Sequence, residues 1–195
     1  MKLIGILILA MTMQNQVIFD FTADSSLEDW LVVDDVVMGG RSDGNFFINE
    51  DGHGVFRGDV SLENNGGFSS IRYRFPSMDV SNHSVILLRL KGDGKRYQLR
   101  VKTSRLDRHS YTINIDTNGE WQEIRVKMND MKPTFRGMTL RMANYPGEKM
   151  SELGFLIGNK KNESFELLID KIEIETGYKQ EKYVWNEKKS GKETA

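Results

Sequence analysis

Apolar and polar side chains alternate along most of this chain, and clusters of glycine and asparagine interrupt the alternation. Ile71, Tyr73 and Phe75, for example, occupy every second position of one such run. A period of two places successive side chains on opposite faces of a β-strand, while glycine and asparagine tolerate the positive φ of tight turns. The pattern therefore predicts antiparallel strands joined by chain reversals, including those at residues 38–44, 50–54 and 64–67.

The same alternation continues through the chain and predicts an all-β fold, an antiparallel β-sandwich of about ten strands. Residues 92–95 and 117–120 are predicted hairpin turns, and residues 134–150 are predicted to form a long surface loop. Residues 85–90 are apolar on both faces, which indicates a strand covered on both sides. Within residues 165–174 the apolar positions change from odd to even numbers, which indicates a β-bulge.

Length and composition limit the class of protein. A chain of 195 residues suits one domain with a substantial core, predicted here at residues 17–175. The absence of cysteine excludes disulfides, thiolate catalysis and cysteine-ligated metal sites. The net charge of -1 gives no electrostatic basis for a nucleic-acid partner.

Both termini depart from the β pattern. Residues 1–16 contain Lys2 and then an apolar run, which predicts a signal peptide or a disordered leader. The run is shorter than the about 20 residues that span a bilayer, so no transmembrane span is predicted. A signal peptide would place the protein in the periplasm or outside the cell, and otherwise the cytoplasm is expected. Residues 176–195 are mostly charged and are predicted to form a tail.

Three motifs that could carry chemistry lack the context they need, and no cofactor or metal site is predicted. Residues 40–44 match G-x-S-x-G around Ser42, but that motif works at a strand-to-helix turn of an α/β fold. Residues 114–119 resemble the start of a calcium loop, yet Arg125 stands where the bidentate glutamate is required. The histidines lie far apart in predicted loops, without the spacing of metal ligands, at positions His53, His83 and His109.

Asp34 and Asp35 interrupt the apolar residues of a strand predicted at residues 30–38. Adjacent side chains on a strand point to opposite faces, so the pair does not form a general acid–base dyad. We expect one aspartate to face solvent and the other to accept hydrogen bonds from turn amides.

The positions opposite the predicted core carry a basic set of side chains with one aromatic ring. If their strands share one sheet, they form a polar face that can bind a carbohydrate, an acidic peptide or a partner protein. The alternative is an ordinary solvated sheet face. The members are Arg72, Arg74, Arg89, Arg96, Gln98, Arg100 and Trp121, with Lys102, Glu123 and Arg125 beside them.

Five sequence blocks, in chain order, resemble the family of complex I intermediate-associated protein 30. They are VVMGGRS at 36–42, GDVSLENNGGF at 58–68, GDGKRY at 92–97, GEWQ at 119–122 and PTFRG at 133–137. The likeness extends over residues 17–174. Its turn residues are Met38, Gly39, Gly40, Asn64, Asn65, Gly66, Gly67, Asp93, Gly94, Arg136 and Gly137.

The resemblance implies a galactose-binding-domain-like jelly roll and a non-enzymatic binding module. Its implied role is protein assembly, or a chaperone-like action on intermediates of respiratory complex I. An exported β-sandwich that binds a carbohydrate or a small ligand is the alternative. An enzyme is the third hypothesis, but the sequence brings together no set of titratable groups that would support one.

Overall fold

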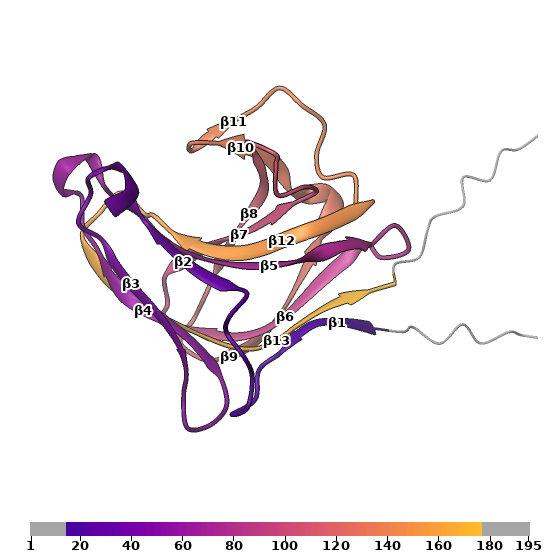
Figure 1. Cartoon of the computed structure of the whole chain (residues 1–195), viewed down its shortest axis with the longest axis horizontal. Helices are drawn as coiled ribbons and strands as arrows, with labels where there is room; N and C mark the ends of the chain where they lie inside the picture. The colour runs from indigo at the N-terminus through magenta and orange to yellow at the C-terminus, as the bar shows by residue number, and fades with distance from the viewer. Residues whose placement is uncertain (1–14, 177–195) are drawn as a thin grey trace, which may run out of the picture.

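Two antiparallel β-sheets form the protein in the computed structural model, which describes residues 15–176 (Figure 1). The alternating residues of the sequence become strands because each strand buries one face against the opposite sheet. One sheet has six strands: β1 (Asn15–Asp20), β3 (Asp43–Ile48), β4 (Gly54–Val60), β6 (Val85–Gly92), β9 (Trp121–Lys127) and β13 (Glu163–Glu175). The second has seven: β2 (Trp30–Asp34), β5 (Ser69–Asp79), β7 (Arg96–Lys102), β8 (Ser110–Asp116), β10 (Lys132–Phe135), β11 (Met138–Thr139) and β12 (Lys149–Ile157).

Strand order in both sheets is far from sequence order. In the six-stranded sheet the order is β3-β4-β13-β6-β9, with β1 also paired to β13. In the seven-stranded sheet it is β11-β10-β8-β7-β12-β5-β2. Figure 1 shows that β10 and β11 rise above β5 and β12, so the outer face of the seven-stranded sheet is concave. The all-β jelly-roll class expected from the sequence is therefore confirmed.

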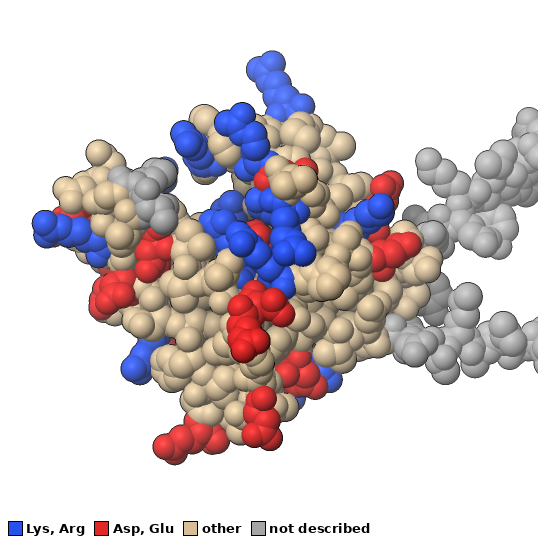
Figure 2. All heavy atoms as spheres, viewed as in Figure 1, with Lys and Arg blue, Asp and Glu red and all other residues tan. Residues whose placement is uncertain are grey.

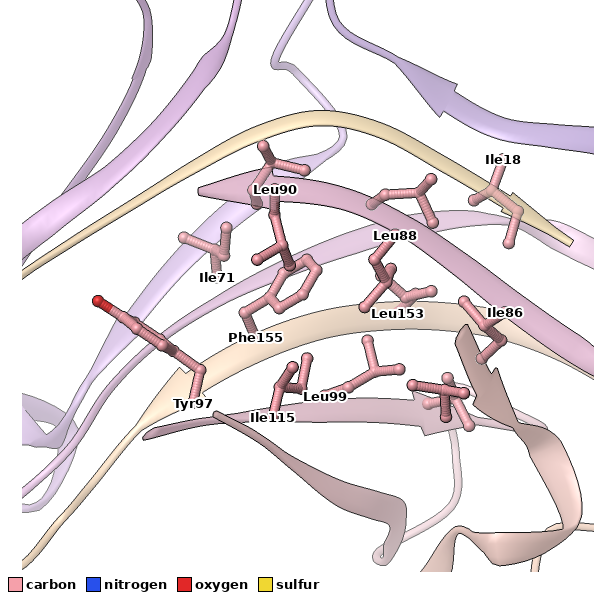
Figure 3. Packing of buried hydrophobic residues seen from close by; sticks show 14 of the residues in the cluster. Ile18, Ile71, Ile86, Leu88, Leu90, Tyr97, Leu99, Ile115, Leu153 and Phe155 are labelled. Carbon is pink, nitrogen blue, oxygen red and sulfur yellow. The ribbon is translucent and has the colours of Figure 1, made fainter. Parts of the chain in front are cut away.

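The core lies between the two sheets and is built from the inward positions of the alternation (Figure 3). Leu99 and Phe155 from the seven-stranded sheet face Leu88 and Ile169 from the six-stranded sheet, and all four are fully buried. Burial of a side chain of this size stabilises the fold by roughly 1.5–3 kcal/mol. The strand predicted at 85–90 is central in its sheet, but its outer face is only partly covered, since Leu87 is buried and Arg89 is exposed.

Most of the predicted turns are not hairpins. The reversal at 50–54 joins paired strands, β3 and β4. In contrast, the segments at 38–44, 64–67, 92–95 and 117–120 carry the chain from one sheet to the other, since the strands on either side belong to different sheets. The two predicted hairpins at 92–95 and 117–120 are therefore wrong, because turn chemistry does not say which strand the next one pairs with.

The predicted bulge in the last strand is confirmed. Ile169 pairs with Leu90 and Lys171 pairs with Arg89, so Asp170 is an extra residue in β13. An extra residue reverses which positions face the core, and this explains the change from odd to even apolar positions.

Three boundaries differ from expectation. The strand predicted at 30–38 ends at Asp34, and Asp35–Met38 form the 3₁₀ turn η1. The predicted loop at 134–150 contains part of β10, all of β11 and the start of β12. Strand β1 begins at Asn15, inside the predicted leader. The rest of that leader, and the predicted tail beyond Thr176, lie outside the described residues.

Helical structure within residues 15–176 is limited to η1, η2 (Glu63–Asn65) and η3 (Met128–Asp130). In this part of the chain no helix has the length and apolar character needed to cross a membrane.

Candidate functional site

The turn residues of the first two sequence blocks, at 36–42 and 58–68, surround the carboxylate of Asp35. Its oxygens accept hydrogen bonds from Ser42 N (2.9 Å), Ser42 Oγ (2.5 Å), Gly67 N (2.5 Å) and Phe68 N (3.1 Å). Asp35 therefore ties the β2–β3 crossing to the β4–β5 crossing. Burial acts to raise the pKa of Asp35, but the hydrogen bonds from Ser42, Gly67 and Phe68 outweigh it and hold the pKa below its usual value.

Glycine is required around this carboxylate for two reasons. A Cβ at Gly40 or Gly66 would lie 2.2 Å or 2.6 Å from an Asp35 oxygen, which is closer than atoms can approach. Gly39 and Gly67 have φ of 91° and 131°, a region that side chains disfavour. The remaining turn residues of these blocks are Asn64 and Asn65, which also adopt positive φ, and Met38, which ends η1. These turn residues hold two crossings together and do not form a binding surface.

Ser42 has no role as a nucleophile in this arrangement. It is buried, its hydroxyl donates to Asp35 Oδ2, and Ser42 Oγ itself accepts a hydrogen bond from Ser61 N at 3.0 Å. The prediction that one of the two aspartates faces solvent is wrong in part, because Asp34 Oδ2 accepts from Gly44 N at 3.0 Å. Both aspartates therefore accept hydrogen bonds from backbone amides, Asp35 from the two crossings and Asp34 from the start of β3.

Asp93, from the third block, plays the same structural part in the β6–β7 crossing. Its carboxylate accepts from Lys95 Nζ (2.5 Å), Tyr97 Oη (2.9 Å) and Glu166 N (3.0 Å). Burial acts to raise the pKa of Asp93, but these bonds lower it overall, and burial together with Asp93 raises the pKa of Tyr97. Gly94 supplies the positive φ of 80° that this turn needs.

The fifth block forms the β10–β11 turn. Arg136 and Gly137 have φ of 49° and 77°, and the Arg136 guanidinium lies 5.4 Å from the Phe135 ring centroid. Arg108, from the loop between β7 and β8, lies 5.2 Å from the same ring. Phe135 therefore holds two exposed cations at this end of the sheet.

The basic face predicted from the sequence is divided between the two sheets. Arg72 and Arg74 belong to β5, and Arg96, Gln98 and Arg100 belong to β7, all in the seven-stranded sheet. Arg89 and Trp121 belong to β6 and β9 in the six-stranded sheet. Their assignment to the same face is therefore wrong, because the chain changes sheet between residues 92 and 96.

The residues left on the seven-stranded sheet form a cluster on its concave outer face, and Figure 2 shows basic side chains gathered at the centre of this view. In the strand register, Gly154 of β12 lies between Arg72 and Arg100, and Glu152 lies between Arg74 and Lys102. We call Arg72, Arg74, Arg100, Lys102 and Glu152 the concave cluster. Arg96 is further along the same face, where its Nε donates to Asp116 at 2.7 Å.

Positive charge exceeds negative charge in the concave cluster. Arg74 Nε donates to Glu152 Oε2 at 3.1 Å, and this is the ion pair recorded for the cluster among the described residues. Arg100 Nη1 donates to the neutral Gln98 Oε1 at 2.8 Å, and Lys102 Nζ donates to the Asp107 carbonyl at 2.7 Å. Four cations therefore share one carboxylate, which leaves the site able to bind an anionic group.

The protein environment lowers the pKa of two of these cations and so disfavours their charged forms. Burial, followed by the charge of Arg72, lowers the pKa of Arg100 to about 10, although Glu152 acts in the opposite direction. Burial also lowers the pKa of Lys102. Desolvated cations gain more from a bound anion than exposed ones do, because water screens their interaction less. An anionic group placed beside Arg100 and Lys102 would therefore interact strongly with their charges.

Glu152 is the one member of the concave cluster that the sequence did not reveal. It is 6% exposed, and β12 carries it between two basic strands. The sequence shows Glu152 as an isolated glutamate at an outward position of a strand. It does not show which residues lie beside it, because Arg74 and Lys102 are 78 and 50 residues away along the chain.

Trp121 has different neighbours on the six-stranded sheet. Its ring centroid lies 4.7 Å from that of His53, and the Arg89 guanidinium lies 5.9 Å from the ring. Asp170, the bulge residue, has one carboxylate oxygen 3.1 Å from Arg89 Nε and the other 3.4 Å from His53 Nε2. Among residues 15–176, no three acidic or histidine side chains come together as metal ligands.

Comparison with known proteins identifies relatives of this chain. The family model described as Complex I intermediate-associated protein 30 matches residues 19–169. The Drosophila melanogaster protein named Complex I intermediate-associated protein 30, mitochondrial, is 23% identical over 83% of this chain, and the Mus musculus protein of that name is 25% identical over 84%. The chain spans 63% of the fly protein and 57% of the mouse protein. Both names say mitochondrial, which gives no support to a periplasmic or extracellular location.

Solved structures with a similar fold include carbohydrate-binding modules. A family 11 module of a Clostridium thermocellum cellulase superposes with a TM-score of 0.63 at 13% identity, covering 84% of this chain and 95% of the module. A family 11 module from the same organism, in complex with a mixed-linked tetrasaccharide, superposes with a TM-score of 0.59 at 15% identity. The superposition covers 82% of this chain and 94% of the module. At this identity the likeness concerns the fold.

Proposed function

Because the chain belongs to the Complex I intermediate-associated protein 30 family, we propose that it is a non-enzymatic binding protein that associates with assembly intermediates of respiratory complex I. The family membership supports a role in the assembly of complex I. The charge of the concave cluster supports binding through an acidic group of the partner. The partner is a protein segment rich in Asp or Glu that lies along the concave face of the seven-stranded sheet.

The observation that carries this proposal is the unbalanced charge around Arg72 and Arg100. Arg72 and Arg100 are the register partners of Gly154 on the two neighbouring strands, and Gly154 has no side chain between them. A carboxylate there accepts N–H donors from both groups, in the paired parallel geometry that lysine does not offer. Binding also restores stabilisation that half-buried cations have lost with their water, so the gain in free energy depends on the negative charge of the partner.

A carbohydrate or small-ligand module is the second candidate, and one observation favours it. The fold is that of carbohydrate-binding modules, and Trp121 offers a ring that is 38% exposed. A sugar ring stacks on an aromatic plane, but Trp121 lies on the six-stranded sheet, whereas the concave face carries arginines at its centre. The charged character of the concave face therefore favours an acidic protein partner.

An affinity pull-down with the full-length protein tests the proposal. We expect complex I subunits to be recovered with the unaltered chain and at least about tenfold less with the double variant Arg72→Gln and Arg100→Gln, since each charge-assisted hydrogen bond contributes roughly 1.5–3 kcal/mol. Arg57→Gln is the matched control, because Arg57 is exposed on β4 in the other sheet. Urea unfolding confirms that both variants are folded.

Two results would contradict the proposal. One is the recovery of no complex I subunit with the unaltered chain, and the other is equal recovery with the double variant. Retention on a mixed-linked glucan gel that is lost in Trp121→Ala would support the carbohydrate alternative instead.

A further inference from the structure

A second surface, at one end of the seven-stranded sheet, has a chemistry that the concave cluster does not explain. It consists of the loop at 103–109, between β7 and β8, and of residues 132–142, which include β10 and β11. The two segments lie together, because Thr134 pairs with Ser110 and Arg108 lies over the Phe135 ring. We call these two segments the loop surface.

Large apolar side chains are exposed on the loop surface. Leu106 is 92% exposed, Met138 64% and Met142 49%. Leu106 and Met138 are the two most exposed large hydrophobic residues of the described chain. Side chains of this type at loop tips lose contact with water only when another surface covers them, so their position indicates an interaction site.

The same segments are strongly basic although the whole chain has a net charge of -1. They contain five basic residues and one acidic residue: Arg105, Arg108, Lys132, Arg136 and Arg141, and Asp107. The Asp107 carboxylate accepts from Ser104 N at 3.0 Å within its own loop. Among the described residues no ion pair is recorded for any of the five cations, while most other arginines have a carboxylate partner. In Figure 2 basic side chains project from the end of the molecule where β10 and β11 lie in Figure 1.

We propose that the loop surface docks the protein on an anionic lipid bilayer, with Leu106, Met138 and Met142 inserted between headgroups and the five cations against the lipid phosphates. The mixture of the two chemistries favours a bilayer over a protein partner. The core of a protein interface is depleted in charged residues and forms a packed patch. Here each apolar tip stands among guanidinium groups, whose long stems allow the charge to reach the headgroup layer while the carbons remain in apolar surroundings.

The position of the loop surface gives the bound protein an orientation. The loop surface and the concave cluster belong to the same sheet, linked through Lys102, whose Nζ donates to the Asp107 carbonyl. Docking therefore places the concave face next to the membrane, within reach of a partner that is itself embedded in or bound to the bilayer. This step does not depend on the identity of that partner.

Vesicle flotation with the full-length protein tests the proposal. The probes are phosphatidylcholine vesicles and phosphatidylcholine vesicles that contain phosphatidylglycerol. We expect binding to the anionic vesicles only, and weaker binding as salt is added. The charge-reversed variant Arg105→Glu and Arg141→Glu should bind at least about tenfold more weakly, since each basic residue near the surface contributes roughly 1 kcal/mol.

A second variant separates apolar insertion from charge. Leu106→Ser with Met138→Ser leaves the charge unchanged and should also weaken binding, whereas the matched pair Val36→Ser and Leu62→Ser, exposed elsewhere at 59% and 41%, should not. Arg57→Glu is the charge control. Absence of binding to anionic vesicles, equal binding to neutral vesicles, or equal binding by both Ser pairs would overturn the proposal. Because the pull-down uses different arginines, failure of either proposal leaves the other open to its own test.

Discussion

Asp35 shows how one side chain can set the geometry of two chain crossings. Its carboxylate is buried, and it accepts four hydrogen bonds from Ser42, Gly67 and Phe68. Removing the charge leaves buried N–H groups without an acceptor of equal strength, and an unsatisfied buried donor costs roughly 1–3 kcal/mol. Residue 35 should therefore be about as sensitive to substitution as a buried core position.

We expect Asp35→Asn to lower the free energy of unfolding by about 3 kcal/mol near pH 7. The folded-state pKa of Asp35 is lowered, so the unfolded chain binds its proton more strongly. The stability from Asp35 is thus complete above about pH 4 and is lost as the pH falls through the folded-state pKa. Urea unfolding near pH 7 and at about pH 3 should show the gap between the two proteins becoming smaller.

Asp51→Asn provides the control, since Asp51 is exposed in the β3–β4 turn. A gap for Asp35→Asn that stays constant with pH would show that the carboxylate charge is not what stabilises the crossings.

At the scale of the strand, β12 and β5 approach each other very closely at Gly154. A Cβ on Gly154 would lie 2.2 Å from the Ile71 carbonyl oxygen, which is fixed by the pairing of these two strands. We expect Gly154→Ala to reduce the free energy of unfolding by about 3 kcal/mol, at the upper end of the range for overpacking.

Gly119→Ala is a suitable comparison, because Gly119 has φ of 86° and no atom lies within 4 Å of the place that its Cβ would take. Backbone strain alone should cost roughly 1–2 kcal/mol there. Chemical denaturation of the two variants measures the difference, and equal losses would show that β5 can shift to accommodate the methyl group.

The elements themselves can largely be predicted from the sequence, and their partners cannot. The alternation at Ile71, Tyr73 and Phe75 and the phase change at Asp170 predict correct strands and a correct bulge, because both are local effects of one buried face. Whether a glycine turn folds back within one sheet or crosses to the other depends on long-range packing. For this reason the turn at 92–95 has the sequence of a hairpin, and the alternation puts Arg89 and Arg96 on one face although they belong to different sheets.

For the whole molecule, strand order predicts where the fold is most resistant to opening. β13 pairs with β1, β4 and β6, and β12 pairs with β5 and β7, whereas β11 has β10 as its partner. The central strands can expose their amides only when the sheets separate, but an edge strand can open alone.

We therefore expect hydrogen exchange, followed by mass spectrometry, to be slowest in β13 and β12 and fastest in β11. The difference should be at least about a hundredfold, which corresponds to roughly 3 kcal/mol between local and global opening. Equal protection of β11 and β13 would show that the seven-stranded sheet opens as a single unit.

The site follows the same division between local and long-range information. Basic residues on alternate positions of β5 and β7 identify four of the five members of the concave cluster, but Glu152 and the curl of the sheet depend on strands brought together from distant parts of the chain.

That curl limits the shape of what can reach Arg100. β10 and β11 stand above β5 and β12 (Figure 1), so a broad, flat protein surface would meet the rim before it met the guanidinium groups. A slender projection, such as an extended chain terminus or a protruding acidic hairpin, enters without that obstruction. The shape of a partner would then decide whether it reaches the arginines, and its charge would decide how tightly it binds there.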